Sequence, residues 1–274
     1  MQSIPLAGTS LSLSRLAFGT ASLHRVGPES AQVEHLRAAF DVGFTHFDTA
    51  PLYGFGAAER ALGVALGQLR NTRLTIATKV GLYPPGGTNQ SRLTMLGRKL
   101  LGQMFPVFSR ALIDWHVTQA RASLDNSLTR LRRDHVDILL LHEPEAGLLE
   151  TDEWLRWLEV ETTQRVAAYG IAGTATRIAP FVAENSPLSC VVQMHDSLEN
   201  READLLADAG RKMQLTYGYL TSAPPSARAE SVLVRALDRN RTGSIIVSTR
   251  HRARLDKLSA IAEATSVHSR DTPC

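Results

Sequence analysis

The sequence predicts an α/β protein, a single (β/α)8 TIM barrel over residues 1–274 with a long loop after the third strand and a short C-terminal tail. Eight short apolar runs alternate with segments of helical periodicity. No linker and no second composition regime interrupts them, which favours closure into one barrel. The alternative is a doubly wound open sheet, which usually carries a glycine-rich first turn. Here Gly54-Phe55-Gly56 follows the second strand and lacks the third glycine of a dinucleotide fingerprint.

The first half of the chain supplies three of the strand and helix pairs. Gly43 closes the first helix, and Ala61, Leu62, Ala65 and Leu66 share one face of the second. We expect strands over 14–20, 43–48 and 74–79, and helices over 29–41, 57–69 and 116–131.

A long excursion over residues 80–113 breaks this rhythm, because glycines and the run 84–87 (Pro-Pro-Gly-Gly) punctuate it. Basic residues interleave there with leucine, methionine and phenylalanine; they are Arg92, Arg98, Lys99 and Arg110. The segment is either an amphipathic lid with a solvated basic face or a lid that recognises phosphate or carboxylate.

The second half of the chain resumes the alternation. Residues 136–141 form an almost continuous apolar run, which is typical of a strand buried on both faces. The expected strands are 136–141, 166–171, 189–193, 213–217 and 244–248, and the expected helices are 152–162, 178–183, 203–209, 229–237 and a last one from 252.

Composition limits the classes of function. The 274 residues are 43% hydrophobic and 21% charged, with a net charge of +3, so disorder and a nucleic-acid partner are disfavoured. Cys190 and Cys274 show no metal spacing and no disulfide framework, which suits a reducing cytoplasm. The start lacks a signal-peptide pattern and no run of eighteen apolar residues occurs, so we expect a soluble, intracellular protein without a membrane partner.

Polar residues stand where four of the predicted strands end. Asp48, Lys79, His142 and Gln193 occupy these ends, and Tyr53 lies just beyond the second strand. Each has a structural interpretation when it is taken alone, such as a turn cap or a packed phenol. In a barrel, however, the carboxyl ends of all strands face one pocket, so together they predict an active site.

Three segments resemble the catalytic-site segments of the aldo-keto reductases. They are 47–54 (Phe-Asp-Thr-Ala-Pro-Leu-Tyr-Gly), 77–81 (Ala-Thr-Lys-Val-Gly) and 140–144 (Leu-Leu-His-Glu-Pro), and the resemblance runs from about 14 to about 257. It implies the barrel fold, an oxidoreductase acting on a small carbonyl or alcohol substrate, and a catalytic tetrad of Asp48, Tyr53, Lys79 and His142.

The chemistry of these side chains agrees with the implied roles. A carbonyl that accepts hydride develops alkoxide character and needs a nearby proton donor. We expect Tyr53 to be that acid and base, with a pKa lowered by the Lys79 ammonium. Asp48 would hold Lys79 in place, and His142 would orient the carbonyl oxygen or relay the proton.

Hydride must come from a cofactor, because no side chain supplies it. The resemblance implies NADPH extended across the barrel mouth, with Gln193 on the carboxamide and Tyr217 stacked on the nicotinamide ring. It also assigns the 2'-phosphate and adenine to Ser248, Thr249, Arg250 and Arg254, a set that is otherwise an ordinary solvated helix start.

Departures from the family pattern keep other functions open. Ala172 and Gly173 stand where the family has Ser-Asn, with Thr174 as a candidate substitute, and the segment 218–226 is short, which predicts a weaker grip on the cofactor. The alternatives are a cofactor-sensing or protein-interaction barrel, a Schiff-base enzyme using Lys79, and, from the run 112–115, a dehydrogenase of sugars or pyridoxal. The sequence leaves substrate, direction and oligomeric state open.

Overall fold

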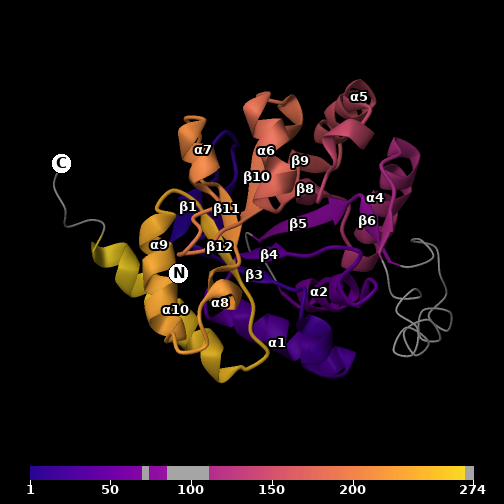
Figure 1. Ribbon diagram of the computed structural model, residues 1–274. Helices are drawn as coiled ribbons and strands as arrows, with labels where there is room; N and C mark the ends of the chain where they lie inside the picture. The colour runs from indigo at the N-terminus through magenta and orange to yellow at the C-terminus, as the bar shows by residue number, and fades with distance from the viewer. Residues whose placement is uncertain (70–73, 85–110, 269–274) are drawn as a thin grey trace, which may run out of the picture.

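The computed structural model describes residues 1–69, 74–84 and 111–268. Eight parallel strands close into a barrel in the order β3-β4-β5-β8-β9-β10-β11-β12, which confirms the predicted fold class (Figure 1). The strands are β3 (Leu16–Gly19), β4 (His46–Asp48), β5 (Thr75–Val80), β8 (Val136–His142), β9 (Val166–Gly173), β10 (Val191–His195), β11 (Leu215–Tyr217) and β12 (Ser244–Val247).

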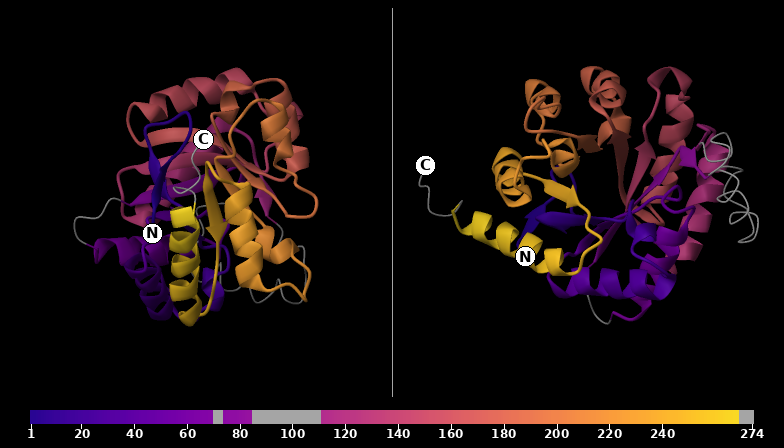
Figure 2. Two further views of the ribbon diagram at one scale, coloured as in Figure 1. Left: turned by 90° about the vertical axis from the view of Figure 1, so that its left-hand side faces the viewer. Right: turned by 60° about the horizontal axis from the view of Figure 1, so that its bottom comes forward.

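Helices form a layer around the outside of this barrel, as the right-hand view of Figure 2 shows. They are α1 (Glu29–Asp41), α2 (Ala57–Gly67), α4 (Val117–Leu131), α5 (Thr151–Thr162), α6 (Ala175–Ala183), α7 (Asp204–Asp208), α8 (Tyr219–Ser222), α9 (Ala229–Arg239) and α10 (Ala253–His268). The helix α1 has the predicted bounds, whereas α6 begins three residues before the expected 178. The four-residue α8 was not predicted.

An antiparallel hairpin of β1 (Ser3–Pro5) and β2 (Ser12–Ser14) precedes the barrel, where the sequence indicated only a polar lead-in. Its Leu6 and Leu13 are buried in one cluster with inward-facing side chains of the barrel strands. The Gln214 side chain, just before β11, donates to the Ala7 carbonyl at 2.7 Å. The hairpin therefore covers the N-terminal end of the barrel, opposite to the end where Asp48 lies.

The bounds of the long excursion after β5 are marked by a second small hairpin. It pairs β6 (Leu82–Tyr83) with β7 (Leu112–Ile113), and the Asp114 N–H donates to the Gly81 carbonyl at 3.0 Å. The expected basic lid residues, Arg92, Arg98, Lys99 and Arg110, lie outside the described residues.

Three tryptophans pack in a row beside this hairpin. The rings of Trp115 and Trp154 have centroids 6.4 Å apart, and those of Trp154 and Trp157 lie 5.4 Å apart. Gly81 adopts φ +101°, and a β-carbon there would lie 2.0 Å from the Trp115 ring. Glycine is therefore required at this position both for its backbone conformation and for the space that the indole fills.

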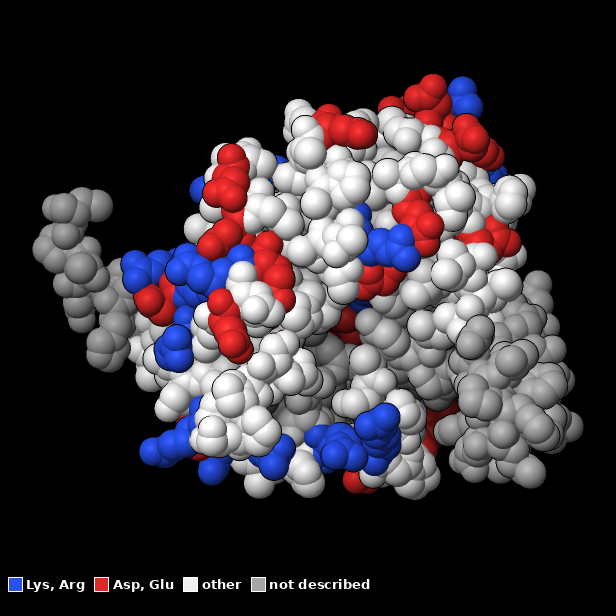
Figure 3. Space-filling model, viewed as in Figure 1, with Lys and Arg blue, Asp and Glu red and all other residues white. Residues whose placement is uncertain are grey.

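The described surface carries both signs of charge. Lys and Arg side chains are scattered among Asp and Glu on the face shown in Figure 3. In the part of the chain that the structure covers, no helix has the length and apolar character needed to cross a membrane. Within the same ranges, no three His, Cys, Asp or Glu side chains are grouped so that they could hold a metal ion.

Candidate active site

The strand ends bring the predicted side chains to one cavity of about 280 Å³. Asp48 and His142 are the last residues of β4 and β8, and Lys79 is the last but one of β5. Parallel pairing places these ends at one mouth of the barrel, because Asp48 lies opposite Ala77 and Lys79 opposite Leu140. The predicted residues that line the cavity are Asp48, Tyr53, Lys79, His142, Gln193, Tyr217 and Ser248.

A buried ion pair lies in the wall of this cavity. The Lys79 Nζ lies 2.5 Å from Asp48 Oδ1 and 3.1 Å from the Thr49 carbonyl oxygen. Only 1% of the Lys79 side chain and 4% of the Asp48 side chain are exposed. Burial lowers the pKa of Lys79 below its ordinary value, while the Asp48 carboxylate acts in the opposite direction. Asp48 therefore both holds the lysine in place and favours its charged form.

The Tyr53 ring lies close to both this lysine and His142. The Lys79 Nζ is 5.0 Å from the centre of the ring, and the His142 ring meets it edge to face with centroids 6.1 Å apart. Burial, followed by the carboxylates of Asp48 and Glu143, raises the pKa of Tyr53 well above 10.0. The expected net lowering of this pKa is therefore wrong, because burial and the two carboxylates dominate. The phenol is instead held in its protonated, proton-donating form.

His142 and Gln193 line the cavity, and each has a buried polar atom without a hydrogen-bond partner among the described residues. Burial and the nearby Lys79 lower the pKa of His142 from 6.5 to about 3, so the ring is neutral at pH 7. Within the described part of the chain, His142 Nδ1 and Gln193 Oε1 are buried without a hydrogen-bond partner. Buried polar atoms are nearly always paired in native proteins, so these two atoms are free to bond a polar ligand.

The remaining residues of the expected cofactor site lie near one another at the start of α10, but three of them do not line the cavity. The carbonyl of the buried Thr249 bonds His35 Nε2 at 2.7 Å, and its hydroxyl accepts from the His251 N–H at 3.1 Å. Arg250 and Arg254 are exposed. The structure thus brings Ser248 to the cavity and leaves Thr249, Arg250 and Arg254 beside it.

Glu143 does not line the cavity, but its carboxylate acts on Tyr53, and the sequence did not single it out. It adopts φ +55°, an uncommon conformation for a residue other than glycine, and its N–H donates to the Ala172 carbonyl at 2.6 Å. Its Oε2 accepts from the Thr174 N–H at 3.2 Å and lies 2.9 Å from where a β-carbon of Gly173 would be. Thr174, the candidate substitute for the missing Ser-Asn pair, is thus already bonded to Glu143.

A wall of the cavity comes from the turn after β11, which the sequence indicated only as a short link. Gly218, Tyr219, Leu220 and Thr221 all line the cavity. The sequence does show a strand end followed by Gly218, which indicates a turn. It does not show that this turn folds over the cavity.

Comparisons with known proteins agree with this geometry. A model of the Aldo/keto reductase family matches residues 15–159, which include Asp48, Tyr53, Lys79 and His142. L-galactose dehydrogenase of Arabidopsis thaliana is 33% identical over 192 residues, 66% of this chain and 51% of that protein. D-threo-aldose 1-dehydrogenase of a Pseudomonas species is 32% identical over 146 residues, which are 51% of this chain and 43% of that protein. The chain thus spans about half the length of these relatives.

A solved structure gives the same fold over the whole length. An aldo-keto reductase from Bacillus halodurans in its holo form superposes with a TM-score of 0.71 at 20% identity. The alignment covers 100% of this chain and 92% of that one. At this identity the likeness bears on the fold alone.

Proposed function

Because the chain belongs to the aldo/keto reductase family, we propose that it is an NADPH-dependent oxidoreductase that interconverts an aldehyde or ketone and the corresponding alcohol. One observation carries the proposal: Asp48, Tyr53, Lys79 and His142 come from three strands and one turn and line a single cavity. A structural role alone would not require a buried ion pair, a half-buried phenol and a half-buried neutral imidazole to share one hollow.

The residues present fit a nicotinamide dinucleotide. The unpartnered Gln193 Oε1 needs a hydrogen-bond donor, which a carboxamide N–H provides, and Tyr217 offers a ring at the same cavity. Ser248 would begin the contacts with the adenine and 2'-phosphate end, and Thr249, Arg250 and Arg254 would extend them at the start of α10. When bound, this cofactor would supply the hydride that the side chains lack.

The protein's own residues move and hold the proton. Tyr53 donates from its hydroxyl to the substrate carbonyl oxygen, and the raised pKa keeps that proton available at neutral pH. The Lys79 ammonium, held by Asp48, stabilises the phenolate that remains after donation. Neutral His142 hydrogen-bonds the carbonyl oxygen and orients it toward Tyr53.

A second candidate is oxidation of a free sugar or of pyridoxal by the same residues. The names of the two curated relatives, both sugar dehydrogenases, motivate it. In this direction Tyr53 would act as a base, and its raised pKa works against that role, so we place reduction first. A Schiff-base function for Lys79 ranks lower, because Asp48 at 2.5 Å favours the ammonium over the nucleophilic amine.

The test compares the wild type with Tyr53→Phe. We expect the wild type to consume NADPH with a panel of small aldehydes, and we expect the variant to bind NADPH normally while losing at least about a hundredfold in kcat. Tyr169→Phe is the matched control, because Tyr169 is a half-buried tyrosine of β9 that does not line the cavity. Full turnover by Tyr53→Phe would overturn the proposed role.

Two further measurements separate the alternatives. NADP⁺ reduction with L-galactose and other aldoses, without NADPH oxidation by aldehydes, would favour the sugar dehydrogenase. Absence of NADPH binding by calorimetry would favour a partner-binding barrel. We also propose a cytoplasmic location, on the absence of any disulfide pattern in the sequence.

A further inference from the structure

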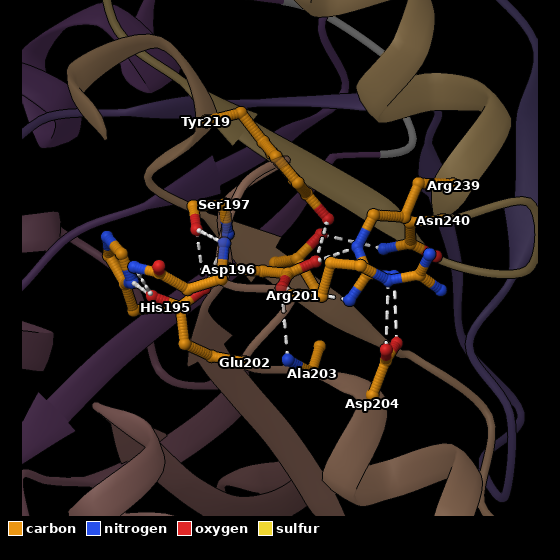
Figure 4. A network of polar contacts seen from close by, with 12 residues as sticks. His195, Asp196, Ser197, Arg201, Glu202, Ala203, Asp204, Tyr219, Arg239 and Asn240 are labelled. Atoms are coloured by element: carbon orange, nitrogen blue, oxygen red, sulfur yellow. Dashed lines mark hydrogen bonds and ion pairs between the residues drawn. The ribbon is translucent and has the colours of Figure 1, made fainter. Parts of the chain in front are cut away.

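The turn 218–222 forms a wall of the active-site cavity, and its Tyr219 side chain is buried and hydrogen-bonded. Tyr219 is 2% exposed, and its hydroxyl donates to Asp196 Oδ2 at 2.5 Å (Figure 4). Tyr219 lines the cavity, and its hydroxyl is bonded to a carboxylate that is fully buried. The Tyr219 hydroxyl thus attaches the wall to a buried carboxylate.

That carboxylate is fixed by partners other than Tyr219. Asp196 Oδ1 accepts from the Ala203 N–H at 3.0 Å, and Arg239 donates to both oxygens, at 2.7 Å to Oδ2 and 3.1 Å to Oδ1. Arg239 also pairs with Asp204 at 2.8 Å. The Asp196 N–H donates to the Tyr217 carbonyl at 2.7 Å. Asp196 therefore links β11 to α7 and α9 and forms a rigid anchor.

A second attachment holds the other end of the turn. His195 Nδ1 lies 3.3 Å from the carboxylate oxygen Oε1 of Glu202. The other ring nitrogen, Nε2, is hydrogen-bonded to the Ser222 hydroxyl at 3.1 Å. Gly218 has φ +106°, and a β-carbon there would lie 2.4 Å from the His195 ring, so the turn also packs directly on the histidine.

We propose that Asp196 and His195 form a clamp that fixes the turn 218–222 in advance as a rigid wall of the cofactor cavity. The inference rests on the proposed function. The clamp acts through Tyr219 and Ser222, which makes Asp196 and His195 positioning residues rather than catalytic ones. A wall that is already ordered costs less entropy when the cofactor binds, which offsets the loss of contacts expected from so short a segment.

The central test is Tyr219→Phe, which keeps the ring and removes only the hydroxyl. In the cofactor-free protein, hydrogen exchange of the Thr221 and Ser222 amides, both bonded to the Gly218 carbonyl, should rise about tenfold. The Kd for NADPH by calorimetry should rise by up to about tenfold, while kcat at saturating NADPH stays within about twofold. A role in global stability alone would not separate Kd from kcat in this way.

Two other variants complete the design. Tyr169→Phe removes a tyrosine hydroxyl from the outer part of β9 and should change neither exchange at 221 and 222 nor Kd. Ser222→Ala breaks the second attachment at an exposed position, and it replaces Tyr219→Phe if that variant does not fold. We expect the same changes, of smaller size.

The outcomes are separable. Unchanged exchange in both Tyr219→Phe and Ser222→Ala would overturn the clamp, whether or not NADPH binds. Faster exchange with an unchanged Kd would overturn its role in cofactor binding. If the wild type bound no NADPH, the proposed function and the clamp's role in cofactor binding would both fail, and the exchange data would still decide whether Asp196 and His195 order the turn.

Discussion

Replacing Lys79 with methionine tests the buried ion pair without reference to any substrate. Methionine keeps most of the hydrocarbon chain but removes the ammonium that lies 2.5 Å from Asp48 Oδ1. Among the described residues, no donor other than Lys79 reaches the Asp48 carboxylate. Only 4% of the Asp48 side chain is exposed. Removing one partner of such a pair leaves an uncompensated buried charge and costs about 3–5 kcal/mol in the free energy of unfolding.

Urea unfolding followed by circular dichroism measures this loss. The double variant Asp48→Asn with Lys79→Met removes both charges and should recover most of the stability, to within about 1–2 kcal/mol of the wild type. The matched control is Lys257→Met, because Lys257 is 69% exposed and lies 3.8 Å from Glu230. That control should cost less than about 0.5 kcal/mol. A loss below about 1 kcal/mol for Lys79→Met, or a double variant less stable than the single one, would refute the reasoning.

Two further predictions concern pH dependence and close packing. Because the pKa of His142 is lowered to about 3 and that of Tyr53 is raised, neither group titrates near neutrality, and kcat for reduction should show no inflection near 6.5. An acid limb near 6.5 that disappears in His142→Gln would contradict this assignment. In α2, Gly63→Ala should destabilise the protein by about 1–3 kcal/mol, because the new β-carbon would lie 2.3 Å from the Arg130 carbonyl oxygen. Gly67→Ala, where the new β-carbon meets open space, should be neutral or stabilising by up to about 1 kcal/mol. Both variants are compared by urea unfolding, and equal changes in their free energies of unfolding would show that packing around the β-carbon does not decide the effect.

The barrel was predictable because a parallel strand buried on both faces leaves an apolar run in the sequence. The β8 strand, Val136–His142, is the clearest instance. The N-terminal hairpin left no such signal, since β1 and β2 have three residues each and β1 buries only Ile4. The helix α8 was missed for a similar reason, because four residues are too few to show a period.

The candidate site also has a part that the sequence predicts and a part that it does not. Asp48, Lys79 and His142 could be identified because each ends, or nearly ends, an apolar run. The direction of the Tyr53 pKa could not be identified, since it depends on burial and on where the Glu143 carboxylate turns. The anchoring of Tyr219 was equally hidden, because it requires Asp196 and Arg239 to meet across 43 positions of sequence.

The row of tryptophans has a spectroscopic consequence. The chain contains three tryptophans, and Trp115, Trp154 and Trp157 are all in that row. With ring centroids 5.4 and 6.4 Å apart, the three indoles all lie in one sector of the protein. Intrinsic fluorescence will therefore report the sector formed by α4, α5 and the β6–β7 hairpin. A change in that emission on heating or in denaturant will report the unfolding of this sector. Unfolding of the opposite side of the barrel has to be followed with a different probe.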